Sequence, residues 1–299
     1  MLAFLPGPIL GVLTFILYIL NSIFFTIPLI PAVVLKLIIP FKFWKSFWNK
    51  VLNFIAESWI RLNNLNMSLT KKINWDISGF EEAELSMDEW YLVIANHQCW
   101  LDVLVLQKIF IGKIPFLKCF IKQELFWLPV FGITWWAMDY PFVKRYTRQH
   151  LLKHPEDKGR DIEITKKACE KFKYFPTAVI NFVEGTRYTD AKRDIQKSAF
   201  KNLLMPKAGG VSLVMDIMGD SLNKIVDVTI AYPQGIRSSW GFLTGKITDI
   251  RIKVEALPVP KDIIRLYTGI DEDQKKIHDW LNGIWLNKDR KLSAMQGNA

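Results

Sequence analysis

The first 35 residues carry no charged side chain, and Lys36 is the first residue that does. Within this stretch, Ile9 to Ile27 form a proline-free run of 19 uncharged residues. A helix of that length, at about 1.5 Å per residue, reaches roughly 28 Å, which is close to the thickness of the hydrocarbon core of a bilayer. The sequence therefore predicts a membrane segment at this end of the chain.

The prolines that follow leave the form of this segment open. Pro28, Pro31 and Pro40 bracket a second apolar stretch, residues 29–39, which is too short to span a bilayer alone. A single span and a membrane-dipping helix pair are both compatible with this pattern. A cleaved signal peptide fits less well, because no basic residues precede the run and no small-residue cleavage site follows it. We expect residues 1–40 to form the membrane segment in one of the first two forms.

Residues 41–70 read as an amphipathic helix at the membrane interface. Aromatic rings and lysines alternate from Phe41 to Lys50, a pattern typical of the headgroup region. The same pattern fits a helix packed on the folded domain, and one helix can do both. Lysines follow the apolar segment, so the positive-inside rule predicts that the rest of the chain is cytosolic, which in a prokaryote means the inner face of the inner membrane.

The net charge of +10 lies entirely in the part of the chain from Lys36 onward. Anionic lipid headgroups account for that charge, and we find neither zinc-finger spacing nor an RNA-binding aromatic motif, so a nucleic acid partner is not expected. Three cysteines, Cys99, Cys119 and Cys169, form no CxxC pair, which predicts a reducing compartment and no cysteine-based metal cage.

Residues 71–299 show the alternation of strands and helices that is typical of a single α/β domain. Apolar or alternating runs predict strands at 73–78, 90–95, 177–183, 225–231 and 246–257. An apolar run predicts a buried helix at 101–110, and apolar residues at helical spacing predict helices at 161–172 and 271–292. The fold class is therefore α/β, a mixed and largely parallel sheet flanked by helices and preceded by the helical membrane module.

Polar residues follow two of the predicted strands, where open α/β sheets bind their ligands. His97 and Asp102 come after the strand at 90–95, and five positions on a regular helix would turn their side chains about 140° apart. They can meet only if His97 precedes the first helical turn and Asp102 lies within it. An aspartate on Nδ1 would then leave Nε2 of His97 free as a general base, although a buried structural histidine fits the same pattern.

The second cluster, from Glu184 to Arg187, follows the strand at 177–183 and contains Gly185 where the backbone must turn. An arginine at such a turn can bind phosphate in bidentate fashion. Glu184 could hold that arginine or contact an acceptor hydroxyl, and a plain surface salt bridge is the competing interpretation.

The two clusters, Asn96-His-x-x-x-x-Asp102 and Phe182-Val-Glu-Gly-Thr-Arg187, together resemble the glycerolipid acyltransferase family, typified by 1-acylglycerol-3-phosphate acyltransferase. The stretch from Phe120 to Gly132 and the Lys144-Arg145 pair resemble two further blocks, and the Lys-Arg ending is closer to the longer subgroup of lysophospholipid acyltransferases. The resemblance implies that His97 and Asp102 are catalytic. It also implies that the acceptor or thioester is bound by Asn96, Lys122, Arg145, Glu184, Gly185, Thr186 and Arg187.

The resulting prediction is a membrane-bound O-acyltransferase that moves an acyl chain from acyl-CoA or acyl carrier protein to a lysophospholipid. It needs no cofactor and no metal. The simplest acceptor is 1-acylglycerol-3-phosphate, and lysophosphatidylglycerol or lysophosphatidylinositol are alternatives. A covalent acyl-enzyme on Cys99 is not required, since the alcohol can attack directly. A phosphohydrolase would usually need a metal site or a phosphate-accepting Asp or Cys in a loop, and the sequence shows neither. A non-catalytic lipid-binding module would not need His97.

Overall fold

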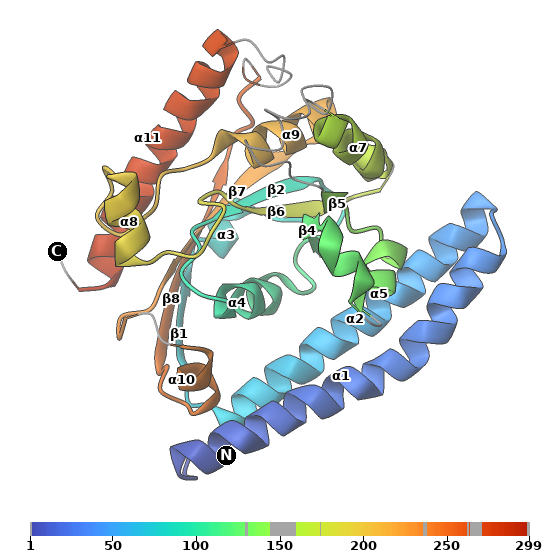
Figure 1. Ribbon diagram of the computed structural model, residues 1–299, viewed down its shortest axis with the longest axis horizontal. Helices are drawn as coiled ribbons and strands as arrows, with labels where there is room; N and C mark the ends of the chain where they lie inside the picture. The colour runs from blue at the N-terminus through green and yellow to red at the C-terminus, as the bar shows by residue number, and fades with distance from the viewer. Residues whose placement is uncertain are drawn as a thin grey trace.

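The computed structural model describes residues 2–128, 131–143, 160–173, 175–235, 238–261, 263 and 271–297. The chain begins with two long helices, α1 (Gly7–Ile38) and α2 (Lys42–Thr70), which run antiparallel along one flank of the molecule (Figure 1). The Asn21 amide donates a hydrogen bond to Oδ1 of Asn63 across this pair (2.6 Å). Helix α1 is long and apolar enough to cross a membrane, and only 22% of its most apolar 18-residue window is buried.

Helix α1 continues through Pro28 and Pro31, where the sequence left a single helix and a helix pair as alternatives. A proline inside a helix removes a backbone hydrogen bond and costs about 3 kcal/mol or more. Burial of neighbouring α1 side chains against α2 offsets this cost, since Leu29, Ala32 and Val33 share one apolar cluster with Leu52. The helical pair is therefore α1 with α2, and the chain turns between them at residues 39–41.

The body is built on a six-stranded sheet in the order β1-β8-β7-β2-β6-β3. All neighbouring strands are parallel except β7 and β8, which are antiparallel. The prediction of a mixed, largely parallel sheet is confirmed. The strands are β1 (Asn74–Ser78), β2 (Tyr91–Ala95), β3 (Leu117–Cys119), β6 (Ala178–Phe182), β7 (Lys224–Ala231) and β8 (Asp249–Leu257).

Two apolar cores sandwich this sheet. Alternate residues of β2 enter opposite cores, with Tyr91 and Val93 facing the core that holds α4 (Leu101–Phe110), and Leu92 and Ile94 facing the other. That second core includes α9 (Ala208–Met218) and α11 (Asp271–Met295). A strand buried on both faces is continuously apolar, as the sequence of β2 is.

Shorter elements complete the described fold. They are α3 (Phe80–Ala83), β4 (Ile121–Lys122), η1 (Gln123–Trp127), α5 (Phe131–Ala137), β5 (Phe142–Val143), α7 (Arg160–Cys169), η3 (Glu170–Lys173), α8 (Asp190–Gln196), η4 (Gly219–Ser221) and α10 (Ser239–Leu243). Strands β4 and β5 form a separate two-stranded sheet.

Candidate active site

The two polar clusters leave the sheet at the same edge. Strands β2 and β6 are parallel neighbours, and their register pairs Ala95 with Phe182, the last residue of each. The imidazole of His97 stacks on the Phe182 ring, with centroids 4.0 Å apart and an interplanar angle of 17°. The backbone N–H of Tyr188 donates to the His97 carbonyl (2.7 Å). Residues separated by about ninety positions in the sequence thus form one site.

His97 and Asp102 form a hydrogen-bonded pair, with Nδ1 of His97 2.8 Å from Oδ2 of Asp102. Helix α4 begins at Leu101, so Asp102 lies in its first turn and His97 precedes the helix, which is the geometry that the spacing demands. The Asp102 side chain is fully buried, whereas 17% of the His97 side chain is exposed. Because Nδ1 faces the carboxylate, Nε2 is the ring nitrogen left for a substrate.

Besides the Cys99 thiol, which lies 3.8 Å from Oδ1, three further donors hold the Asp102 carboxylate in place. Oδ2 accepts the backbone N–H groups of Gln98 (2.6 Å) and Cys99 (2.9 Å), and Oδ1 accepts the Tyr232 hydroxyl (2.7 Å). Burial, followed by the nearby Asp102 charge, raises the pKa of Tyr232 well above its usual value, so the phenol remains a donor. The sequence did not assign this role to Tyr232, which lies 130 residues further along the chain.

Cys99 lies beside the pair, but its surroundings do not favour a nucleophile. Its side chain is buried, and burial together with the Asp102 charge raises the pKa of the thiol to about 12. The thiolate is the nucleophilic form of cysteine, and near neutral pH almost none is present at such a pKa. The geometry therefore supports direct attack by an alcohol over an acyl-enzyme on Cys99.

Glu184 makes different contacts from those that the sequence suggested. Its carboxylate is fully buried and accepts the backbone N–H groups of His97 (2.8 Å, Oε1) and Leu204 (2.9 Å, Oε2). Burial raises its pKa to about 7, and the two backbone hydrogen bonds act in the opposite direction. Glu184 thus joins the His97 loop to the chain after α8 and has no surface with which to contact an acceptor hydroxyl.

Asn96 is also structural in its contacts, although the resemblance placed it among the substrate-binding residues. Its side chain is fully buried, donates to the Ile230 carbonyl (2.9 Å) and accepts the Ile230 N–H (2.9 Å). With these two bonds the Asn96 side chain extends the hydrogen bonding between β2 and β7 by one residue. Asn96 therefore fixes the point at which the chain leaves β2 just before His97.

The turn from Gly185 to Arg187 is open to solvent and rich in cations. Gly185 has φ +68°, a left-handed conformation that favours glycine, and the Lys207 side chain lies 3.1 Å from the position of an added Cβ. Arg187 is exposed. Nζ of Lys192 donates to Oγ1 of Thr186 and to the Arg187 carbonyl, each at 2.9 Å. The sequence identified Thr186 and Arg187 but not Lys192 or Lys207, whose positions depend on the later course of the chain.

Of the other two predicted binding residues, only Lys122 is among the residues that the structure describes. Lys122 is exposed at the end of β4, and no described hydrogen bond or ion pair connects its side chain to His97 or Arg187. Arg145 lies outside the described residues. Their roles stay predictions from the family resemblance.

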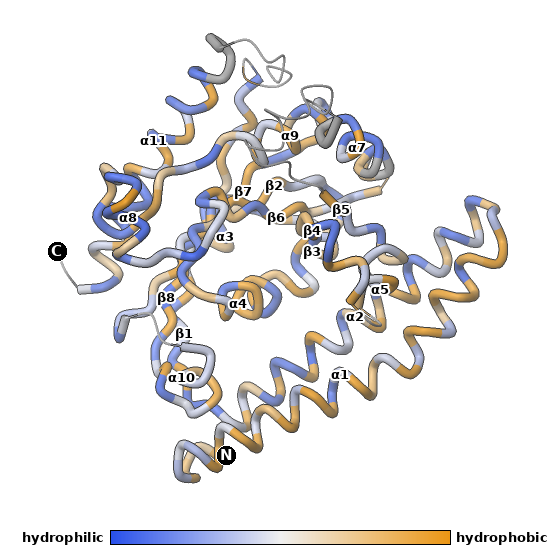
Figure 2. Tube along the Cα trace, in the orientation of Figure 1, coloured by the Kyte–Doolittle hydropathy of each residue, from blue (hydrophilic) through white to orange (hydrophobic). Residues whose placement is uncertain are grey.

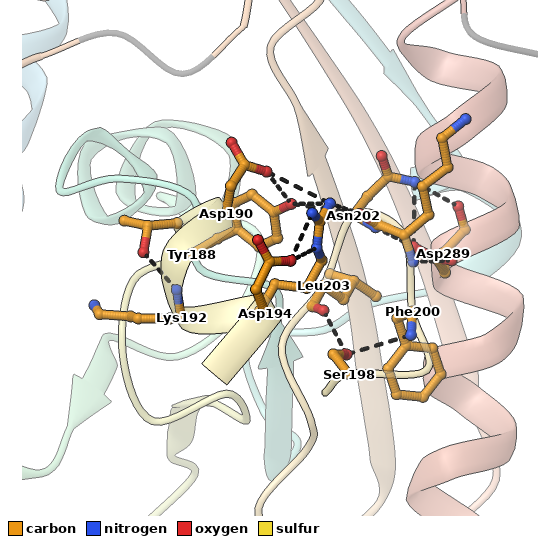
Figure 3. A network of polar contacts seen from close by, with 12 residues as sticks. Tyr188, Asp190, Lys192, Asp194, Ser198, Phe200, Asn202, Leu203 and Asp289 are labelled. Atoms are coloured by element: carbon orange, nitrogen blue, oxygen red, sulfur yellow. Dashed lines mark hydrogen bonds and ion pairs between the residues drawn. The ribbon is translucent and has the colours of Figure 1, made fainter. Parts of the chain in front are cut away.

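A polar network connects Tyr188, which follows the turn, to α11 (Figure 3). Nη1 of Arg193 on α8 donates to the Tyr188 hydroxyl (3.4 Å) and to the Lys201 carbonyl (3.3 Å). The backbone N–H of Asn202 donates to Asp289 of α11 (2.7 Å). The network also borders a cavity of about 290 Å³ lined in part by Gln98 and Tyr232. The cationic turn is therefore held by side-chain contacts on the side of α8 and α11.

The described residues include no group of three or more His, Cys, Asp or Glu side chains that could hold a metal ion. The expectation that catalysis uses no metal and no cofactor is not tested by this finding and stays a prediction.

Comparison with known proteins places these motifs in context. The family model described as Acyltransferase matches residues 78–233, which include every described residue of the pair and the turn. A protein of Arabidopsis thaliana named probable 1-acyl-sn-glycerol-3-phosphate acyltransferase 5 is 26% identical over 89% of this chain and 68% of its own length. A protein of Saccharomyces cerevisiae named 2-acyl-1-lysophosphatidylinositol acyltransferase is 23% identical over 81% of this chain and 70% of its own. The matches to other curated relatives, such as the human protein named 1-acyl-sn-glycerol-3-phosphate acyltransferase gamma, cover about half of those proteins.

A solved structure has a similar fold. The crystal structure of the 1-acyl-sn-glycerophosphate acyltransferase PlsC from Thermotoga maritima aligns with a TM-score of 0.53 and covers 95% of each chain at 16% identity. At that identity the likeness concerns the fold, including the helices ahead of the sheet.

Proposed function

Because this chain belongs to the acyltransferase family, we propose that it transfers a fatty acyl group from a thioester to the free hydroxyl of a lysophospholipid. The names of relatives from two kingdoms support a glycerophospholipid acceptor. The simplest acceptor is 1-acylglycerol-3-phosphate, with phosphatidic acid as the product. The proposed donor is acyl-CoA or acyl carrier protein.

The observation that supports this reaction best is the 2.8 Å contact between His97 and a fully buried Asp102 beside an exposed cationic turn. Nε2 of His97 takes the proton of the acceptor hydroxyl as that oxygen attacks the thioester carbonyl carbon. The C–O bond forms and the carbonyl electrons move to oxygen. Collapse of this intermediate breaks the C–S bond, and the thiolate takes the proton from His97. Asp102 stabilises the imidazolium in between.

The acceptor phosphate is proposed to bind at the Gly185–Arg187 turn. Arg187 can bind a phosphate through two parallel N–H groups, and positive charge is added by Lys192 beside Thr186 and by Lys207 beside Gly185. A lysophospholipid with a larger headgroup carries the same phosphate. Lysophosphatidylinositol is therefore the second candidate acceptor, favoured by the name of the yeast relative.

Membrane attachment through α1 and the start of α2 fits substrates whose tails reside in lipid. The large side chains on the outer face of α1 are exposed, including Phe24 at 61% and Ile27 at 67%. Exposed lysines at positions 42, 45 and 50 follow at the start of α2, where they can meet anionic headgroups on the cytoplasmic face. Lys36 does not share that role, because its side chain is buried.

Acyl transfer from oleoyl-CoA to 1-acylglycerol-3-phosphate by the full chain in detergent, followed as released thiol, tests the proposal. We expect turnover by the wild type and loss of at least two orders of magnitude in His97→Ala, since a general base contributes about 10² to 10⁴. His278→Ala is the matched control, because His278 is exposed on α11 and distant in sequence from the site.

The alternatives give different results in the same assay. Full activity of His97→Ala would show that the pair is structural. Binding without turnover by the wild type, across lysophosphatidic acid, lysophosphatidylglycerol and lysophosphatidylinositol, would favour a lipid-binding module. Replacing oleoyl-CoA by oleoyl acyl carrier protein identifies the donor.

A further inference from the structure

A second apolar surface lies outside the N-terminal helices. Residues 125–136, which run from η1 into α5, contain no charged side chain. The described members of this segment include six large apolar side chains that are exposed: Leu125 (40%), Trp127 (82%), Leu128 (43%), Phe131 (42%), Ile133 (54%) and Trp136 (47%). Contiguous exposed apolar surface of this kind marks a site of contact with a partner or a membrane.

The segment that carries this surface is closely packed, η1 against α5 and β5. An added Cβ at Gly132 would lie 1.7 Å from the carbonyl oxygen of Phe126, so η1 and α5 approach as closely as two backbones can. The Gly132 N–H donates to the Leu128 carbonyl (3.0 Å), and the Phe126 ring meets Phe142 of β5 edge to face. Its apolar side chains therefore project from a fixed base.

The end of α5 packs into the helical pair. Ala137 and Met138 are buried in one cluster with Leu29 and Val33 of α1 and with Leu52 of α2. Figure 1 shows α5 beside the two long helices, and Figure 2 shows that α1 is predominantly apolar, whereas α5 combines apolar residues with residues near the middle of the hydropathy scale. The surface of residues 125–128 and 131–136 is thus continuous with the apolar face of α1.

The single charge of α1 is neutralised at this junction. Lys36 donates a hydrogen bond to the Ala137 carbonyl and forms an ion pair with Asp139, with 3.3 Å between Nζ and Oδ2. Its side chain is only 7% exposed. Because the junction itself uses this charge, no lysine interrupts the apolar surface between α1 and α5.

We propose that the surface of residues 125–128 and 131–136 enters the lipid bilayer beside α1, as a second membrane contact that the Lys36–Asp139 pair fixes in place. This proposal rests on the proposed attachment of α1 to the membrane. Tryptophan is enriched at the membrane interface, which suits Trp127 and Trp136. Lys122, which precedes η1 and is exposed, lies at the charged border of the segment and would meet lipid headgroups.

The test uses the full chain labelled with an environment-sensitive fluorophore at single introduced cysteines, in a Cys119→Ala background where Cys99 and Cys169 are buried. The reporter position is Trp127→Cys. The matched control is Ile195→Cys, because Ile195 is also 82% exposed but lies on α8. Phe24→Cys reports on α1. Each protein is mixed with vesicles of phosphatidylcholine and phosphatidylglycerol that carry nitroxide groups on their acyl chains.

We expect several-fold quenching of the labels at 127 and 24 and none at 195. A label at 127 that stays unquenched while the label at 24 is quenched overturns this inference and leaves the attachment of α1 intact. If neither is quenched, both proposals are wrong about the membrane. Quenching at 195 equal to that at 127 also overturns the inference, because lipid contact would then not be confined to this surface.

Discussion

Replacing Asp102 by asparagine isolates the charge of the buried carboxylate. Asparagine has the same shape, and its oxygen can keep the bonds to His97, Gln98 and Cys99 while its amide faces the rotatable Tyr232 hydroxyl. What is lost is the attraction between the carboxylate and the imidazolium that forms when His97 takes a proton. For unit charges about 4 Å apart at an effective dielectric constant of about 20, that attraction is about 4 kcal/mol. We expect kcat to fall about 10³-fold.

The assay is thiol release from oleoyl-CoA with saturating lysophosphatidic acid, compared between wild type, Asp102→Asn and Tyr232→Phe. The tyrosine variant keeps the charge and removes one neutral donor, so we expect a loss of about tenfold or less. Thermal unfolding of each variant shows whether the fold survives. Activity of Asp102→Asn within tenfold of the wild type, with His97→Ala inactive, would refute the argument that the aspartate charge stabilises the imidazolium.

Three further outcomes follow from the geometry. The pKa of Glu184 is raised from 4.5 to about 7, so its protonated form adds up to about 3 kcal/mol of stability. This stability is present below pH 4.5 and is lost as the pH rises past 7. The melting temperatures of wild type and Glu184→Gln should therefore converge or cross over this pH window, and a constant difference between them would contradict the argument. Cys99→Ser should keep activity within a few-fold, and a loss as large as that of His97→Ala would restore the acyl-enzyme. Gly132→Ala should lower the melting temperature by several degrees because its Cβ would meet Phe126, whereas Gly209→Ala on α9, with open space around it, should not.

The sequence predicts five of the six strands of the central sheet, because each of these five is long enough to show a pattern of apolar residues. Strand β2 is buried on both faces and is uniformly apolar, while β8 alternates. The sequence does not predict β3, β4 or β5, since two or three residues show no period. It leaves the form of the first apolar segment open, and in the structure one helix, α1, continues through both prolines.

In the candidate site, too, the sequence predicts some contacts and not others. The contact between His97 and Asp102 depends on five residues of chain and is predictable from the start of α4. The Tyr232 hydroxyl contacts Asp102 from the end of a strand 130 residues further along the chain, and no local sequence pattern predicts this contact. Glu184 lies where the resemblance put it, but its carboxylate points inward to two backbone amides. A motif gives the position of a side chain along the chain, and only the fold gives its direction.

Lys36 meets its partners late in the synthesis of the chain. Ala137 and Asp139 follow it by 101 and 103 residues, and ribosomes add about 5 to 20 residues per second, so about 5 to 20 s pass before they emerge. In the proposed membrane attachment, Lys36 lies at the end of an apolar helix and is synthesised before Ala137 and Asp139, at a position where insertion machinery counts lysines to orient a nascent segment. The same side chain can therefore act first as an orientation signal and later as an internal ion pair, once α5 arrives.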